Sequence, residues 1–171
     1  EFGDLDGDGD MDLLVGDFNG FIQYFENISS GGNIAFTFVE NVGDIDLSGN
    51  SVPTLGDLDA DGDLDMLIGQ LNGTLAFYRN IGTTLQYNFQ EETFDDIQME
   101  SNSAPELYDI DADNDDDLVL GSANDGVFIY KNNPNNSGFQ FQLNSTVPRI
   151  GVNTRPAIGQ LFNDGKLDII T

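Results

Sequence analysis

The chain of 171 residues falls within the size range of one domain, and its 39% hydrophobic and 11% aromatic content is sufficient for a folded core. Its formal net charge of -26, from 31 acidic and 5 basic residues, excludes nucleic acid as a partner, because phosphate binding needs clustered Lys and Arg. Cysteine and histidine are both absent, which excludes disulfides, thiolate metal sites and histidine-assisted catalysis.

An acidic segment of nine residues recurs along the chain and defines a repeat. It begins at Asp4, Asp57 and Asp109, and an eroded copy begins at Gln160, with spacings of 53, 52 and 51 residues. A period of about 50 residues is typical of propeller blades. We therefore expect blades at roughly residues 1–45, 46–98 and 99–150, and part of a fourth at 151–171.

Each repeat predicts four strands in the same order. A proline-led strand precedes the acidic segment, an apolar strand that ends in glycine follows it, and the third strand ends at an asparagine. The fourth alternates polar and apolar side chains, as a half-exposed outer strand does. In chain order the expected strands are 2–3, 13–16, 21–25, 35–39, 51–56, 66–69, 75–78, 87–90, 103–108, 118–121, 127–130, 139–142 and 154–159.

Turn dipeptides separate the second and third strands of each repeat. They predict two-residue hairpins at Asn19-Gly20, Asn72-Gly73 and Asp125-Gly126. The apolar second strands, such as 66–69, are expected to be buried on both faces.

No segment has helical periodicity, so the sequence predicts an all-β fold of propeller blades, each with four antiparallel strands. About three and a half blades are present, in a single domain that spans residues 1–171. Closed propellers usually need about four to eight blades, so this segment should not close a ring by itself. The chain opens without Met in the middle of a repeat, and we expect it to be part of a longer protein.

Carboxylates fall on every second position of the first acidic segment and glycines open the backbone between them, which allows several oxygens to turn toward one cation. Counted from the first Asp, side chains at positions 1, 3, 5 and 9 and the backbone carbonyl at position 7 are expected to surround one ion. Calcium accepts about six to eight oxygens in loose geometry, whereas magnesium requires a stricter octahedron, so we expect three calcium sites. Their residues are Asp4, Asp6, Asp8, Asp10 and Asp12 in the first loop, Asp57, Asp59, Asp61, Asp63 and Asp65 in the second, and Asp109, Asp111, Asp113, Asp115 and Asp117 in the third.

Position 6 of the loops requires a sharp reversal of the chain. Gly9 and Gly62 occupy it in the first two loops and Asn114 in the third. Glycine adopts a positive φ without strain, and asparagine is the next most tolerant residue, so we expect a positive φ at all three.

The fourth copy of the acidic segment departs from this pattern, and another kind of calcium loop, the EF-hand, is excluded. In the fourth copy, residues 160–168, Gln160 and Phe162 replace the first two carboxylates and Lys166 adds a positive charge, so we expect this loop to bind no calcium. An EF-hand is excluded because its loop requires a bidentate Glu at position 12. That position here holds an apolar strand residue: Val15, Ile68 or Leu120.

The unit that spans residues 56–69, GDLDADGDLDMLIG, resembles the FG-GAP or VCBS repeat, and Phe2-Gly3 and Leu55-Gly56 stand where that family places its Phe-Gly. Such repeats form integrin-alpha-like propellers and occur in many large bacterial surface proteins. The resemblance covers the whole chain. It implies calcium in the loop between the first and second strands of a blade, usually in a seven-bladed ring, and it fixes no ligand.

From these patterns we expect a non-enzymatic extracellular module, secreted or on the cell surface, with a bacterial outer surface as its setting. Calcium would stabilise each blade, and loops on the faces of the ring would bind a protein or glycan ligand, as in cell adhesion. Extracellular calcium loops work at millimolar affinity, which matches the calcium concentration outside cells. Two alternatives stay open: an accessory domain of a secreted carbohydrate-active enzyme, and a structural spacer or assembly subunit. The remaining blades of a longer chain are further expected partners.

Overall fold

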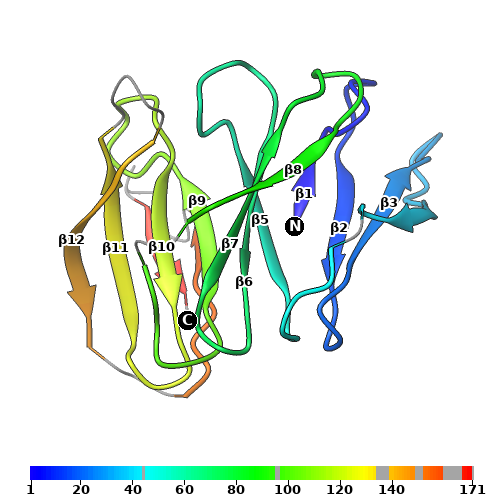
Figure 1. Ribbon diagram of the computed structural model, residues 1–171. Helices are drawn as coiled ribbons and strands as arrows, with labels where there is room; N and C mark the ends of the chain where they lie inside the picture. The colour runs from blue at the N-terminus through cyan, green and yellow to red at the C-terminus, as the bar shows by residue number, and fades with distance from the viewer. Residues whose placement is uncertain (44, 95–96, 134–138, 149–151, 160–166, 171) are drawn as a thin grey trace.

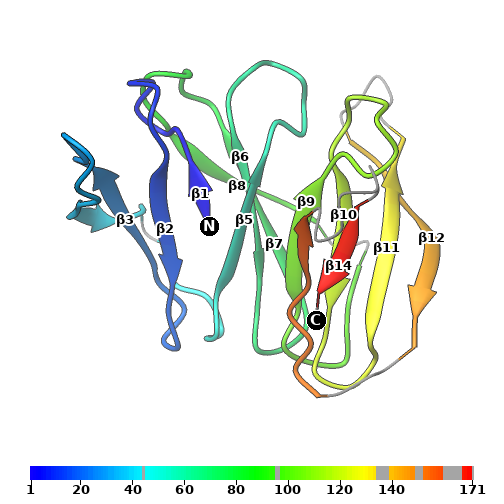
Figure 2. The ribbon, with the colours of Figure 1, turned by 180° about the vertical axis from the view of Figure 1, so that it is seen from behind.

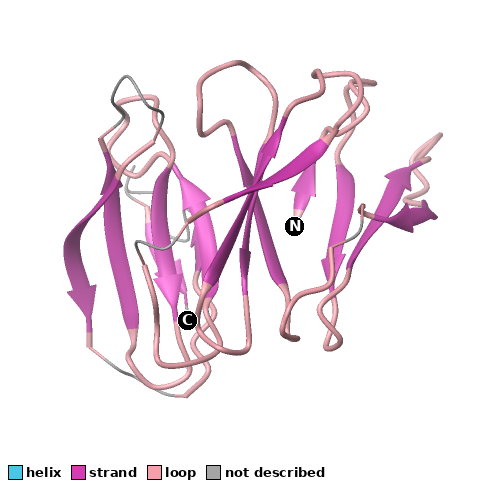
Figure 3. Cartoon of the chain, viewed as in Figure 1, coloured by secondary structure: helices cyan, strands magenta, loops and turns pink. Residues whose placement is uncertain are grey.

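The computed structural model describes residues 1–171 except 44, 95–96, 134–138, 149–151, 160–166 and 171. Separate β-sheets lie side by side as blades in both views (Figures 1 and 2). Every regular element among the described residues is a strand (Figure 3), which confirms the all-β prediction. In this part of the chain no helix is long and apolar enough to cross a membrane.

Three sheets have four antiparallel strands each, and in every sheet each strand pairs with the next one along the chain. This meander is the blade of a propeller, so the prediction of partial propeller blades is confirmed. The first blade has β1 (Phe2–Gly3), β2 (Asp12–Gly16), β3 (Ile22–Asn27) and β4 (Phe36–Asn41). The second has β5 (Val52–Gly56), β6 (Asp65–Gly69), β7 (Leu75–Asn80) and β8 (Phe89–Glu92). The third has β9 (Ala104–Tyr108), β10 (Asp117–Gly121), β11 (Val127–Asn132) and β12 (Phe141–Val147), and a two-stranded sheet follows with β13 (Ala157–Gly159) and β14 (Asp168–Ile170).

The hydrophobic core lies between the blades. Because successive side chains of a strand point to opposite faces, Met66 and Ile68 of β6 pack in the cluster shared with the first blade, while Leu67 packs in the cluster shared with the third. All five residues of β6 and of β10 are buried, as predicted for strands covered on both faces. A fully buried side chain of this size contributes about 1.5–3 kcal/mol, so these strands join the blades into one unit.

The outermost strands β4, β8 and β12 are almost entirely exposed or half-buried, which agrees with their alternating pattern. Water therefore covers the outer edge of each of these three blades.

The connections between second and third strands differ from the prediction. Gly16 pairs with Ile22, so residues 17–21 separate β2 from β3. The Asp17 amide donates to the Phe21 carbonyl at 3.0 Å, the Gly20 amide donates to the Asp17 carbonyl at 3.3 Å, and Gly20 has a φ of 100°. The two-residue hairpin prediction was wrong: Asp17 and Phe21 still pair through the backbone, so the turn itself has three residues, 18–20, and Gly20 occupies its left-handed position.

At the same end of the molecule, each blade is joined to the next by a buried hydroxyl at the start of the innermost strand. The Ser103 hydroxyl accepts a hydrogen bond from the Gln70 amide at 2.8 Å and donates to the Thr74 carbonyl at 2.6 Å. Ser51 and Thr154 make the equivalent bonds to the preceding blade. The hydroxyls therefore fix the connection between the second and third strands of each blade, here called the 2–3 connection, to the following blade without any ligand.

The glycine that ends each second strand permits this junction. A Cβ built on Gly69 would overlap the backbone oxygen of Ser103, and the same holds for Gly16 with Ser51 and for Gly121 with Thr154. Only a residue without a side chain lets the next blade approach so closely.

Candidate metal centres

The three acidic loops join the first strand of a blade to the second, at the upper end of the molecule in Figure 1. Residues 4–11 connect β1 to β2, residues 57–64 connect β5 to β6, and residues 109–116 connect β9 to β10. Both ends of each loop are thus fixed in neighbouring strands of one sheet.

Three carboxylates converge in every loop. In each, one carboxylate oxygen per residue lies within 4.8 Å of the other two, at positions 1, 3 and 5. The clusters are Asp4 with Asp6 and Asp8, Asp57 with Asp59 and Asp61, and Asp109 with Asp111 and Asp113. The predicted ligands at positions 7 and 9 lie outside these clusters.

Backbone amides hold the converging carboxylates in place. In the second loop Asp57 accepts hydrogen bonds from the amides of Asp61 and Gly62, both at 3.1 Å, and Asp61 accepts one from the Asp63 amide at 3.1 Å. The third loop repeats the three bonds at the same positions. The loop therefore wraps around its own carboxylates, with several oxygen lone pairs left over for another partner.

The backbone reverses at two positions of each loop. Position 6 has a positive φ in all three, 95° at Gly9, 97° at Gly62 and 73° at Asn114, which confirms the prediction. Position 4 is also left-handed, and the sequence analysis missed it because Ala60 and Ala112, with φ of 60° and 62°, are unusual there. An alanine in this region costs about 1–2 kcal/mol, so the loop stores strain at its tightest point.

The carboxylate at position 9 links the loop to the third strand through hydrogen bonds, and this link is called the bracket below. Asp65 is almost fully buried and accepts hydrogen bonds from the Leu58 amide at 3.1 Å and the Asn80 amide at 2.8 Å. Asp12 and Asp117 make the equivalent pairs of bonds. Burial, more than the neighbouring Asp59, raises the pKa of Asp65 to about 7, and the two amides oppose the rise. Its role as a metal ligand stays a prediction.

Some carboxylate oxygens at these loops have no hydrogen-bond partner within the described part of the chain. They are Oδ1 of Asp10, Asp59 and Asp63. Asp63 is only 7% exposed, and burial together with the nearby Asp61, Asp59 and Asp57 raises its pKa. A buried acceptor without a donor is unfavourable, and a hard cation would satisfy it. The converging carboxylate oxygens are the hard ligands that calcium prefers.

Two loops carry a basic side chain that the sequence analysis did not assign. Arg79 of β7 pairs with Asp59, and Lys131 of β11 pairs with Asp111. Each stands directly before the asparagine that ends the third strand, and Glu26 holds the equivalent position in β3. Comparison of the three repeats at this position would have revealed the difference in charge.

The fourth acidic segment, residues 160–168, is expected to bind no calcium. Gln160, Phe162 and Lys166 lie outside the described residues, so the expectation that this loop binds no calcium stays a prediction.

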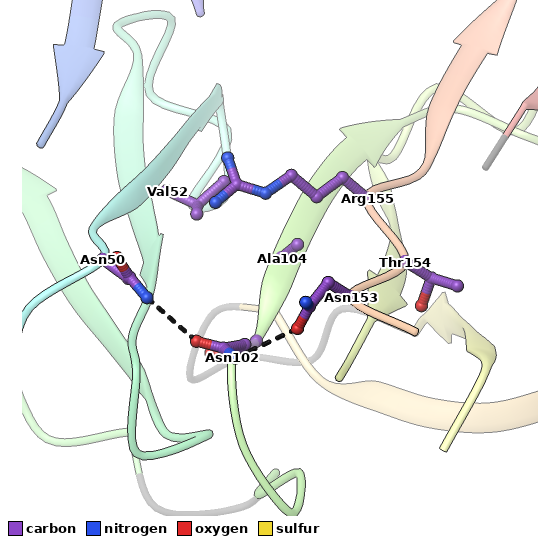
Figure 4. A pocket seen from close by; sticks show the side chains of 8 residues that line it. Asn50, Val52, Asn102, Ala104, Asn153, Thr154 and Arg155 are labelled. Carbon is purple, nitrogen blue, oxygen red and sulfur yellow. Dashed lines mark hydrogen bonds between the residues drawn. The ribbon is translucent and has the colours of Figure 1, made fainter. Parts of the chain in front are cut away.

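A separate polar cavity lies at the starts of β5 and β9, whereas the acidic loops follow the ends of these strands; Figure 4 shows the residues that line it. Asn50 donates through Nδ2 to Oδ1 of Asn102 at 3.1 Å, and Asn102 donates to Asn153 in the same way at 3.2 Å. With Arg155 and other residues they line a cavity of about 170 Å³. All three asparagines have a positive φ, and their spacing follows that of the loops, which is the signal that the sequence analysis did not use.

Comparison with protein families gives a match to the FG-GAP-like repeat over residues 4–68 and 109–171, which is more than half of the chain. No curated protein and no solved structure matches it. The family match covers the first blade from its acidic loop onward, the first half of the second blade including its acidic loop, and the chain from the third acidic loop onward. The chain is therefore a member of the FG-GAP-like repeat family.

Proposed function

We propose that the chain is a calcium-stabilised segment of a β-propeller in which each of the three complete blades binds one calcium ion in its acidic loop. The convergence of three carboxylates in all three loops carries this proposal. The buried Oδ1 of Asp63, which has no hydrogen-bond partner among the described residues, supports it independently, because burial of this atom is unfavourable without a cation or a donor. Positions 1, 3 and 5 supply the first ligands, and positions 7 and 9 complete the set.

Calcium is preferred over magnesium on chemical grounds. The loops offer only oxygen ligands on a backbone of small residues, and calcium tolerates the irregular geometry that such a loop provides. The net charge of -26 adds a second reason, because bound cations reduce the repulsion that opposes folding.

Calcium at these positions would stabilise more than the loop itself. The bracket at position 9 links each loop to the end of the third strand, so a loop ordered by calcium also orders one edge of its blade. We place the protein outside the cell, secreted or on the cell surface, because loops of this kind bind at concentrations typical of extracellular calcium. The segment is non-enzymatic, and its blades present a ligand-binding surface for adhesion.

We infer that a glycan is the ligand class for this surface. Tyr87 and Phe89 line a cavity of about 700 Å³ between the first and second blades, together with Glu40 and Glu91. Aromatic rings beside carboxylates offer a sugar both a stacking face and hydrogen-bond acceptors. A glycan array probed in calcium with the full chain tests this assignment, and an absence of binding across charged and neutral sugars would leave a spacer or assembly subunit as the better role.

Calcium titration by calorimetry, with thermal unfolding in calcium and in EDTA, tests the metal proposal. We expect three calcium-binding events and a rise in Tm with calcium. The same concentration of magnesium should not reproduce this rise. Asp61→Ala should remove one event, whereas Glu100→Gln, which removes a carboxylate outside the loops, should remove none. Equal melting curves in calcium and in EDTA would refute the proposal.

A further inference from the structure

The three loops share one geometry but differ in the charge that faces them. The deciding residue precedes the asparagine at the end of the third strand: Glu26 in the first blade, Arg79 in the second and Lys131 in the third. No Lys or Arg occurs before Arg79 in the sequence, so residues 1–78 provide no basic side chain for the first loop.

Arg79 is held in place from two sides. Its Nε donates to Oε1 of Glu92 at 2.7 Å and its Nη2 to Oε2 of the same residue at 3.2 Å, while Nη1 contacts Oδ2 of Asp59. The guanidinium thus bridges the outer strand β8 and the position 3 carboxylate of the loop. Lys131 makes the corresponding contact with Oδ2 of Asp111.

We propose that this third-strand residue sets the calcium affinity of each loop. Arg79 and Lys131 are built-in counter-ions that occupy a ligand carboxylate until calcium displaces them, and the first loop, with an acidic residue instead, fills first. This inference rests on the proposed calcium binding and adds an order of occupancy to it.

Charge gives the reason for the order. Calcium that binds the second loop must either break the contact between Arg79 and Asp59 or remain close to a positive charge, and both options weaken binding. At short range the exchange of a positive for a negative charge on a partly exposed side chain changes the affinity for a divalent cation by about tenfold. The same ion pairs hold loops 2 and 3 together when calcium is absent, whereas the first loop has no such support among the described residues.

Charge-exchange variants of the full chain test the inference by calcium calorimetry. Asp6→Ala and Asp111→Ala first remove calcium binding at the first and third loops. The remaining binding event then reports the second loop alone. In this background Arg79→Glu should tighten calcium binding about tenfold. The matched control is Arg155→Glu, which makes the same change in net charge at an exposed position outside the loops and should leave the affinity within about twofold.

A second measurement separates this role from a merely structural one. Without calcium, Arg79→Glu should lower Tm, because the loop loses its internal counter-ion, so the variant becomes less stable and yet binds calcium more tightly. The converse exchange, Glu26→Arg, is made in the chain with an intact first loop. It should weaken calcium binding at that loop about tenfold. Equal effects of Arg79→Glu and Arg155→Glu on affinity would overturn the inference while calcium binding stands. A parent chain that takes up no calcium would overturn both.

Discussion

The two ends of each blade are stabilised in different ways. At the end with the 2–3 connections, the Ser103 hydroxyl both accepts and donates hydrogen bonds, and all of its partners belong to the protein. At the other end, carboxylates face one another, and Oδ1 of Asp63 has no partner in the described structure. Protein atoms alone satisfy the hydroxyl at the first end, whereas a counter-ion would stabilise the crowded carboxylates at the second.

The difference indicates how one repeat combines a permanent joint with a conditional one. Close backbone approach and neutral hydrogen bonds join neighbouring blades without a counter-ion. Like charges at the other end make the loops responsive to cations, either the internal Arg79 and Lys131 or a metal ion. Four predictions test this contrast, in order of decreasing effect.

The largest effect is expected at the permanent joint. In Gly69→Ala the new Cβ would overlap the Ser103 carbonyl and crowd Pro105, so the third blade must shift away from the second. We expect a loss of about 3 kcal/mol in the free energy of unfolding, measured by urea denaturation in calcium.

Gly159→Ala is the matched control for this substitution. Gly159 also ends a short strand, but a Cβ there meets no atom within 4 Å and its φ is not positive. The control should change stability by less than about 0.5 kcal/mol. A similar loss in both variants would mean that close approach between blades does not matter at Gly69.

The next effect distinguishes the ends by their response to calcium. Asp65→Ala leaves the buried amides of Leu58 and Asn80 without an acceptor, and Ser103→Ala does the same to the Gln70 amide. Each should cost about 2 kcal/mol without calcium. Denaturation in calcium should enlarge the loss for Asp65→Ala, because a loop ligand is gone, and leave that of Ser103→Ala unchanged. Identical calcium dependence in both variants would contradict the division into two kinds of joint.

A smaller effect concerns pH in the absence of calcium. Burial first, then repulsion from Asp59, raises the pKa of Asp65 to about 7, above the value of about 3.9 for an unfolded Asp. Between these values the folded chain binds more protons than the unfolded chain, so stability decreases as pH rises from about 4 to about 7. Thermal unfolding in EDTA should show this decrease.

Calcium should reduce the slope of stability against pH, since the cation favours the charged carboxylate. Glu106 of β9 provides an internal reference: burial, then the charge of Glu1, raises its pKa to about 7, and it lies outside the loops. Its part of the slope should persist in calcium. A slope that calcium leaves wholly unchanged would place the titrating groups away from the loops.

Local patterns were sufficient to predict most of the fold. The alternation in β4, the apolar run in β6 and the recurring glycines each specify a strand and its burial, because side-chain period and hydrophobicity act within a few residues. The turn at Gly20 was predicted as too short, since an Asn-Gly pair suits both a two-residue hairpin and a three-residue connection. The pairing of neighbouring strands decides between them.

The candidate sites were predictable only where the ligands lie close together in sequence. Positions 1, 3 and 5 of each loop met as expected, because a tight turn brings alternate residues to one side. The contact of Arg79 with Asp59 was not predicted, because it depends on the register of β7 against β6 and spans 20 residues. The hydroxyl of Ser103 was missed for the same reason: its partners belong to the preceding blade.

The smallest effect is expected from the asparagines at the permanent joint. Asn102 accepts from Asn50 and donates to Asn153, but these bonds are partly or fully exposed, so replacing its side chain should cost only about 0.5–1 kcal/mol. Asn102→Gly is the informative variant, because glycine keeps the positive φ of 49° without strain and removes only the amide. Asn102→Ala should lose about 1 kcal/mol more, from backbone strain alone. Urea denaturation of both variants separates the two contributions, and equal losses would show that the backbone at this position is free to relax, so that the joint there is less rigid than its hydrogen bonds indicate.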